Sequence, residues 1–219
     1  RDLYANIPNV GIRKLNSAYA VGGGPLLVST IESNYRVDID NYASVDFSSM
    51  ANIIDLVGGV DLEVSTQEAG YINMYLDEQC RLQGLNASDY YVAGGGITHL
   101  NGNQAVGFAR IRYTSRGNEH SDYGRTSRQR EILVQLMQKA RSLDATTLLA
   151  VVNNMLPLIT HNIDAATLTT LIANAPSYIN YDIQTDRIPY DGLYSNLGEE
   201  LVPDFEATIN RLHQTIYGN

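Results

Sequence analysis

Apolar and polar residues along the chain follow two periods, which predict strands alternating with helices. Residues 60–64 (Val-Asp-Leu-Glu-Val) alternate apolar and polar side chains, as in a strand with one face buried. Within 132–140 the apolar residues recur at steps of three and four, as on one face of a helix. The same reasoning predicts further strands at 37–47 and 184–189, and helices at 26–35, 50–57, 67–79, 103–108, 125–142, 145–156, 165–173 and 203–216. This alternation indicates an α/β layered fold.

Glycine and proline mark the boundaries between these elements. Gly22-Gly23-Gly24-Pro25 is a strong break followed by a helix start, and Gly58-Gly59 ends the helix before the strand at 60–64. The range 84–96 is a polar, glycine-rich loop. We find no internal repeat or linker, so we expect a single domain over residues 1–219.

Composition excludes several classes of protein. No stretch reaches the roughly 18–20 apolar residues that cross a membrane, because Asn153, Asn154 and Pro157 interrupt the most apolar region, 148–159. The single cysteine, Cys80, rules out an internal disulfide framework. The chain begins at Arg1 without an initiator methionine, so we expect that an upstream segment has been removed.

Charge is unevenly distributed along the chain. The formal net charge is −9, which argues against general nucleic-acid binding. More than half of the 15 lysines and arginines nevertheless fall between Arg110 and Arg141. If residues 109–113 are extended, Arg110 and Arg112 point to the same side, where an oligoanion would relieve their mutual repulsion.

The predicted helix at 125–142 adds to this cluster. Its apolar stripe is Ile132, Leu133, Leu136, Met137 and Ala140, and the same steps backwards lead to Gln129 and Arg125. The stripe thus ends at a helix N-terminus, which favours anions. The pattern fits a pyrophosphate or polyphosphate site. A solvated basic patch, with Asp122 as an N-terminal acid and Arg125 paired to a carboxylate, is the alternative.

Several segments in order carry a resemblance to a known family. They are Arg1-Asp2-Leu3-Tyr4, residues 14–20 (Lys-Leu-Asn-Ser-Ala-Tyr-Ala) followed by Gly22-Gly23, Asp46-Phe47, residues 54–60 (Ile-Asp-Leu-Val-Gly-Gly-Val), residues 100–105 (Leu-Asn-Gly-Asn-Gln-Ala), residues 109–112 (Ala-Arg-Ile-Arg) and residues 122–129 (Asp-Tyr-Gly-Arg-Thr-Ser-Arg-Gln). In this order they resemble motifs of the LytR-CpsA-Psr family of extracytoplasmic phosphotransferases, over roughly residues 1 to 140.

The resemblance implies a fold, a reaction and a site. It implies a central mixed β-sheet flanked by helices in α/β/α layers, with this chain lacking the first family strands. It implies transfer of a glycopolymer from a polyprenyl-pyrophosphate carrier to peptidoglycan, with a pyrophosphatase side reaction when water is the acceptor. Carried over by motif, the head-group site consists of Arg1, Lys14, Arg110, Arg112, Arg125 and Gln129, with Arg128 ranked lower. Asp122 is either a residue that orients or deprotonates the attacking hydroxyl, or an ordinary N-terminal helix acid.

The same resemblance implies a cofactor and a location. Mg²⁺ serves the intact family domain, but its aspartates lie upstream of the first motif, and no residue here matches them. We therefore expect this chain by itself to bind Mg²⁺ poorly. We expect a missing N-terminal segment to anchor the protein at the outer face of the bacterial membrane. We also expect the sheet edge that the missing strands expose to be covered in a homodimer or by another segment. A binding module for polyprenyl phosphates or wall glycans, without turnover, is the alternative function. A transcriptional role fits the acidic charge poorly.

Overall fold

The fold is described from a computed structural model that covers residues 3–116, 121–178, 181–198 and 200–218, without the side chains of residues 82, 83, 121 and 122. These residues form two compact units, each built from more than one stretch of chain, and each is described by itself. The first unit contains residues 1–44, 161–163 and 184–219, and the second contains 45–160 and 164–183. The single domain predicted over residues 1–219 stays a prediction.

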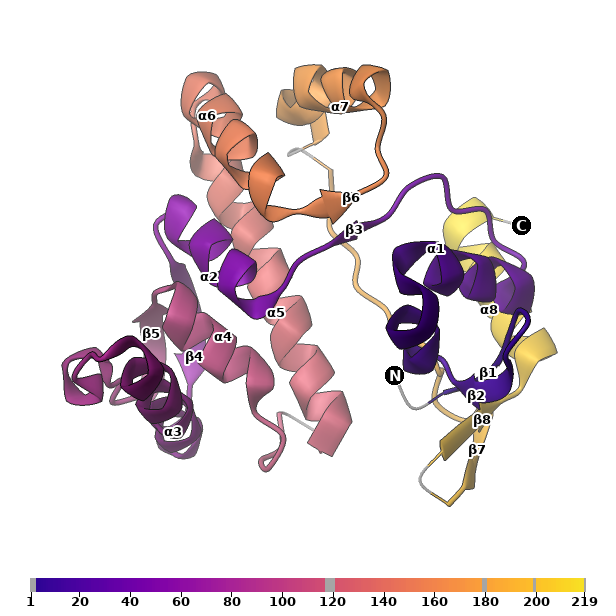
Figure 1. The fold of residues 1–219 in the computed structure, drawn as a ribbon, viewed down its shortest axis with the longest axis horizontal. Coiled ribbons are helices and arrows are strands. Elements are labelled where there is room, and N and C mark those ends of the chain that lie inside the picture. Colours follow the sequence, from indigo (N-terminus) through magenta and orange to yellow (C-terminus); the bar gives the residue numbers. More distant parts are fainter. Residues whose placement is uncertain (1–2, 117–120, 179–180, 199, 219) are drawn as a thin grey trace. The chain divides into compact units, whose positions relative to one another are not determined.

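The first unit combines two hairpins with two helices (Figure 1). Strands β1 (Tyr4–Ile7) and β2 (Gly11–Lys14) pair antiparallel, as do β7 (Tyr194–Leu197) and β8 (Glu200–Pro203). A parallel bridge between Leu3 and Leu201 joins the two hairpins. Helices α1 (Asn16–Tyr35) and α8 (Phe205–Tyr217) contribute Tyr35 and Ile209 to a small core.

Helix α1 contains the break that the glycine run predicts. Gly22 and Gly23 leave the helical conformation, and Gly23 takes a φ of 62°, which residues with a side chain rarely adopt. Helix then resumes through Pro25. Before this kink, residues from Asn16 onward already form helix, which the hydrophobic pattern did not predict.

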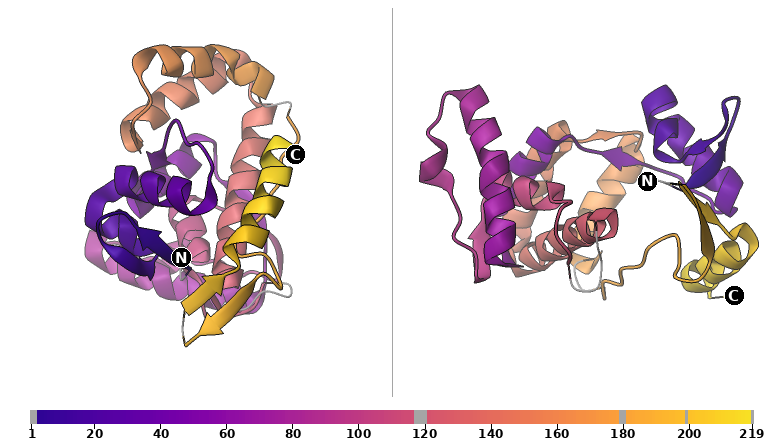
Figure 2. Two further views of the ribbon diagram at one scale, coloured as in Figure 1. Left: turned by 90° about the vertical axis from the view of Figure 1, so that its right-hand side faces the viewer. Right: turned by 90° about the horizontal axis from the view of Figure 1, so that it is seen from below.

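The second unit is built around strands β4 (Val60–Val64) and β5 (Gly96–Leu100), which pair antiparallel. Val60 and Val64 are fully buried, so the alternation read from the sequence is confirmed. The other elements of this unit are α2 (Phe47–Leu56), α3 (Thr66–Gln83), the 3-10 turn η1 (Ala87–Tyr90), α4 (Gly102–Arg110), α5 (Ser121–Ser142), α6 (Ala145–Met155), the 3-10 turn η2 (Leu156–Leu158) and α7 (Ala165–Tyr178). Figure 2 shows α6 and α7 as adjoining orange helices, and these two helices contact each other.

Capping side chains explain where the helices of the second unit begin. Asp46 caps α2 by accepting a hydrogen bond from the backbone N–H of Ser49, so this helix begins earlier than the predicted residue 50. Ser65 with Glu68 forms a capping box at α3, and Asn101 with Gln104 forms one at α4. Gly58-Gly59 ends α2 as predicted.

The α/β class is confirmed, but the arrangement of the strands differs from one central mixed sheet. The described strands form four separate two-stranded sheets, one of which pairs β3 (Ala43–Ser44) with β6 (Thr160–His161). Most of the strand predicted at 37–47 and all of that at 184–189 lack ladder partners. Their apolar residues, among them Val37 and Ile188, instead pack on the core that contains Tyr35 and Ile209. Burial against helices thus produced the apolar pattern that predicted strands.

Candidate functional site

Four of the predicted site residues line one pocket in the second unit. Arg110, Arg112, Arg125 and Gln129 surround a cavity of about 290 Å³ together with Ala109 and three aromatic residues. Among the described residues that line it, none is acidic. Three guanidinium groups around one opening favour an oligoanion as its occupant.

The end of α4 brings Arg110 and Arg112 together, and the condition that residues 109–113 be extended does not hold at Ala109 and Arg110. Ala109 and Arg110 close α4, because its capping box and the buried Ala105, Val106 and Phe108 sustain helix to that point. Ile111 then takes an extended conformation and is fully buried. Arg110 and Arg112 therefore reach one pocket through a helix end rather than through strand alternation.

Aromatic rings hold the Arg110 guanidinium in place. Its central carbon lies 4.6 Å from the ring centroid of Tyr75 and 5.3 Å from that of Phe47. The Tyr75 hydroxyl also donates a hydrogen bond of 3.0 Å to the Arg110 carbonyl. Among the described residues it pairs with the exposed Glu78, at 3.9 Å, which is a weak surface interaction. Arg110 is thus fixed in orientation while its charge is only partly compensated by Glu78.

Helix α5 supplies Arg125 and Gln129 from its second and third turns. Arg125 is 9% exposed and is among the few buried charged residues described. Gln129 donates a long hydrogen bond of 3.5 Å to the Ala109 carbonyl, which links α5 to the end of α4. Because α5 begins at Ser121, Arg125 and Gln129 lie one and two turns beyond its N-terminal end, and the helix start predicted at Arg125 is one turn too late.

The apolar stripe predicted on α5 is only partly correct. Ile132 is buried and Leu136 packs on the main core, but Leu133 and Met137 are 51% and 44% exposed. The buried face runs instead through Arg125, Arg128, Ile132 and Leu136. A charged side chain, Arg128, occupies a core position that the apolar pattern could not reveal.

Arg128 lies outside the pocket and anchors the segment that forms one wall of it. Its side chain is fully buried and makes a 2.9 Å ion pair with Glu68. It also donates hydrogen bonds to the carbonyls of Ile111, Thr114 and Ser115 at 3.4, 3.2 and 3.0 Å. These carbonyls flank Arg112 and Tyr113, so a buried arginine holds the backbone that carries two pocket residues.

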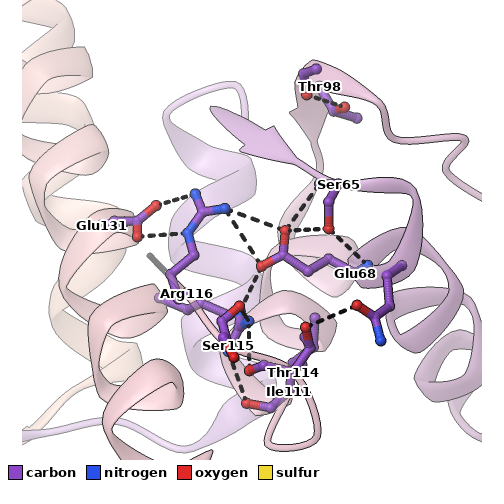
Figure 3. A network of polar contacts seen from close by, with 11 residues as sticks. Ser65, Glu68, Thr98, Ile111, Thr114, Ser115, Arg116 and Glu131 are labelled. Carbon is purple, nitrogen blue, oxygen red and sulfur yellow. Dashed lines mark hydrogen bonds and ion pairs between the residues drawn. The ribbon is translucent and has the colours of Figure 1, made fainter. Parts of the chain in front are cut away.

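Arg116 extends this network towards α5 (Figure 3). It lies between Glu68, at 3.3 Å, and Glu131, to which its Nε donates a 2.9 Å hydrogen bond. Burial raises the pKa of Glu68, but hydrogen bonds from the Ser65 backbone and from Arg128 outweigh it, and the pKa lies below its ordinary value. The hydrogen bond to Glu131 raises the pKa of Arg116. Glu68 is therefore an ionised carboxylate shared by two arginines.

A second pocket of about 220 Å³ adjoins the first and is mostly apolar. The two pockets share Phe47, Ala109 and Gln129. Its other lining residues come from α2, α4 and α5 and from the residues just before α2, namely Val45, Asp46, Met50, Ile54, Ala105, Val106, Ile132 and Leu133. A cationic pocket that adjoins an apolar one suits an amphiphile that carries a charged head and a hydrocarbon tail.

Comparison with known proteins places the chain in a family. The model of the LytR_cpsA_psr family matches residues 1–212. The chain belongs to the LytR-CpsA-Psr family. The polyisoprenyl-teichoic acid–peptidoglycan teichoic acid transferase TagU of Enterococcus faecalis is 31% identical over 163 residues, which are 71% of this chain and 46% of TagU. The probable cell wall biosynthesis protein LcpB of Corynebacterium glutamicum is 35% identical over 143 residues, 65% of this chain and 30% of LcpB.

Solved structures show the same fold for this LytR-CpsA-Psr chain. A structure described as TagT bound to LIIa-WTA has a TM-score of 0.71 at 20% identity and covers 100% of this chain and 76% of TagT. TagV of Bacillus subtilis has a TM-score of 0.69 at 23% identity, and the match covers 98% of this chain and 78% of TagV. The chain spans less than half the length of the TagU and LcpB sequences that it matches.

Some features expected of a LytR-CpsA-Psr site lie outside what the structure describes. Arg1 and the side chain of Asp122 are not among the described residues. Lys14 ends β2 in the first unit, whereas the pocket residues all belong to the second. The head-group roles of Arg1 and Lys14 and the role of Asp122 stay predictions.

The magnesium expected of LytR-CpsA-Psr domains has no evident site in the described part of the chain. No three His, Cys, Asp or Glu side chains gather there closely enough to hold a metal ion. The described residues thus do not by themselves fit the ion, and Mg²⁺ stays a prediction. Within the same residues, no helix is both long and apolar enough to cross a membrane.

The sequence did not reveal the aromatic part of the site. Phe47 and Tyr75 come from α2 and α3, far along the chain from the arginines, and no local pattern connects them. Tyr113 directly follows Arg112 and was the one aromatic residue that its position could have indicated.

Proposed function

We propose that this LytR-CpsA-Psr chain binds a polyprenyl-pyrophosphate-linked glycan through its arginine pocket and serves its transfer to peptidoglycan at the outer face of the cell membrane. The observation that carries the proposal is the meeting of Arg110, Arg112 and Arg125 in one pocket that shares three lining residues with an apolar one. The pyrophosphate would occupy the first pocket and the start of the prenyl chain the second. The transferase activity in the name of TagU supports the reaction, and the name of LcpB supports a role in the cell wall.

The arginines suit the charge that develops in such a transfer. A peptidoglycan hydroxyl would attack the phosphorus nearer the sugar, and the bond from that phosphorus to the bridging oxygen would break. The sugar phosphate would then be joined to peptidoglycan as a phosphodiester, and polyprenyl phosphate would leave with the bond's electron pair. Arg110, Arg112 and Arg125 would stabilise the negative charge that grows on the leaving phosphate. Asp122 is our candidate to receive the proton of the attacking hydroxyl.

A binding experiment tests the pocket. Geranylgeranyl pyrophosphate would be titrated into the wild-type chain and into an Arg110→Ala/Arg112→Ala variant, with calorimetric detection. Loss of two charge-assisted contacts should weaken binding at least about a hundredfold. Arg211→Ala is the matched control, because Arg211 also stacks on an aromatic ring, 4.0 Å from the centroid of Tyr190, but does not line the pocket.

The result separates transfer from binding alone. No binding by the wild-type chain, or equal binding by the double variant, would refute the pocket assignment. Tight binding that depends on the arginines, but no transfer of a labelled glycan to peptidoglycan with Mg²⁺ supplied, would favour a non-catalytic binding module. Release of inorganic phosphate or polyprenyl phosphate without an acceptor would reveal the pyrophosphatase reaction.

A further inference from the structure

An exposed tyrosine stands at the edge of the arginine pocket. Tyr113 lines the pocket, and its side chain is 69% exposed. Tyr71, from α3, packs against it with ring centroids 5.8 Å apart and ring planes inclined by 36°. Single exposed aromatic residues are ordinary on protein surfaces, so exposure alone indicates nothing. Two further observations distinguish Tyr113.

The backbone that carries Tyr113 is held from both sides. Arg128 donates to the carbonyls of Ile111 and Thr114, which come shortly before and directly after Tyr113. The Thr114 hydroxyl also donates a 3.1 Å hydrogen bond to Gln67 at the start of α3, the helix that carries Tyr71. The ring is therefore presented at a fixed place beside the arginines rather than on a loose loop.

The chemistry of the proposed donor specifies what such a ring would meet. In a polyprenyl-pyrophosphate-linked glycan, a single oxygen joins the first sugar to the pyrophosphate. If the arginines hold the pyrophosphate, that sugar must lie at the edge of the same pocket. The C–H face of a sugar ring is weakly polar and packs well on the flat, electron-rich face of an aromatic ring.

We infer that Tyr113, supported by Tyr71, is the platform on which the sugar attached to the pyrophosphate stacks, and that it contributes to the choice of donor. The inference rests on the proposed function, since the arginines must first place the pyrophosphate. It assigns Tyr113 a role in specificity, through contact with the sugar, and none in bond breaking.

Two lipids that differ only in the sugar test this role. Geranylgeranyl pyrophosphate and geranylgeranyl-pyrophosphoryl-N-acetylglucosamine would be titrated into the wild-type chain and into Tyr113→Ala and Tyr113→Phe variants. Tyr113→Ala should weaken binding of the sugar-bearing lipid about three- to tenfold more than it weakens binding of the sugar-free lipid, which is the size of one stacking contact. Tyr113→Phe keeps the ring face and should bind both lipids as the wild type does.

Tyr181→Ala is the matched control. Tyr181 is 64% exposed and pairs with Tyr178 at a centroid distance of 5.9 Å, but it does not line the pocket. An equal effect of Tyr113→Ala on both lipids, or no effect on either, would overturn the platform while the proposed function stands. An effect that arises only when peptidoglycan is added would also overturn it, because the ring would then serve the acceptor. A wild-type chain that binds neither lipid would refute both proposals.

Discussion

Two arginines on α5, three residues apart, show how position decides the role of one side chain. Arg125 lines the pocket, whereas Arg128 is fully buried and bound to Glu68 and to three carbonyls. Burying a guanidinium is unfavourable unless a carboxylate and further acceptors compensate it. Glu68 supplies that carboxylate at the N-terminal end of α3, and the three carbonyls accept from three of the other N–H groups.

Glu68→Gln should therefore destabilise the fold strongly. At pH 7 we expect a loss of about 3–5 kcal/mol in the free energy of unfolding, because Arg128 keeps its charge and loses its buried partner. Glu206→Gln is the control, since the Arg36–Glu206 pair is largely exposed and removing it should cost less than about 1 kcal/mol. Urea denaturation of both variants measures the difference, and equal losses would contradict the central role of Glu68.

The same variant should reveal a pH dependence of known sign. The pKa of Glu68 is lowered in the folded chain, so the stability that its carboxylate contributes is complete above the pKa of an unfolded glutamate, about 4.3. That contribution is lost as the pH falls through the lower, folded pKa. The difference in the free energy of unfolding between wild type and Glu68→Gln should accordingly become smaller as the pH is lowered below about 4. A difference that grows there would contradict an ionised Glu68 in the folded chain.

At the scale of elements, the close approach of α2 and α4 shapes the site. Gly102, the first residue of α4, lies so near α2 that an added Cβ would stand 2.0 Å from the Ala51 carbonyl oxygen. Its backbone N–H also donates a 2.7 Å hydrogen bond to Asp55. Because α4 ends at Arg110 and both helices line the apolar pocket, their spacing affects both pockets.

Gly102→Ala should force α4 away from α2. We expect a loss of about 1–3 kcal/mol in stability and weaker binding of geranylgeranyl pyrophosphate. Gly70→Ala is the matched control, because Gly70 lies inside α3 with nothing within 4 Å of an added Cβ, and it should stabilise the fold by up to about 1 kcal/mol. Thermal unfolding of the two variants checks the contrast. Similar changes in stability for Gly102→Ala and Gly70→Ala would show that α4 can move away from α2 at little cost.

Elements were predictable where local sequence determines them. Residues 60–64 form the strand that their alternation indicates, and the helices near 67–79, 145–156 and 203–216 are present with longer or shifted ends. The prediction of a strand at 184–189 is wrong, because Ile188 is apolar in order to pack on the core beside helices α1 and α8 and not to form a ladder. In the site, too, the residues that cluster along the chain were predictable and those brought in by tertiary packing were not. Its arginines cluster along the chain, but Phe47 and Tyr75 join them only through packing of α2 and α3.

At the scale of the whole molecule, charge restricts the partners. The net charge of −9 opposes the phosphate backbone of nucleic acids, even though the chain carries an arginine pocket.

Duplex DNA should accordingly not bind this chain. Fluorescence anisotropy with a labelled 30-base-pair duplex at about 0.15 M salt should show no saturation up to a protein concentration of about 100 μM, near the weak limit of non-specific binding. Saturation in the low micromolar range would contradict this expectation. The Arg110→Ala/Arg112→Ala variant would then show whether the pocket is responsible.

The carbonyls held by Arg128 have a thermodynamic consequence for ligand binding. A segment that must become ordered around its ligand loses conformational entropy at that moment, and the observed affinity falls accordingly. The carbonyls of residues 111, 114 and 115 are tied to a buried side chain, so the ordering of this segment belongs to folding. A ligand that enters the pocket meets a wall already in its final shape, and its binding entropy should contain little contribution from this segment.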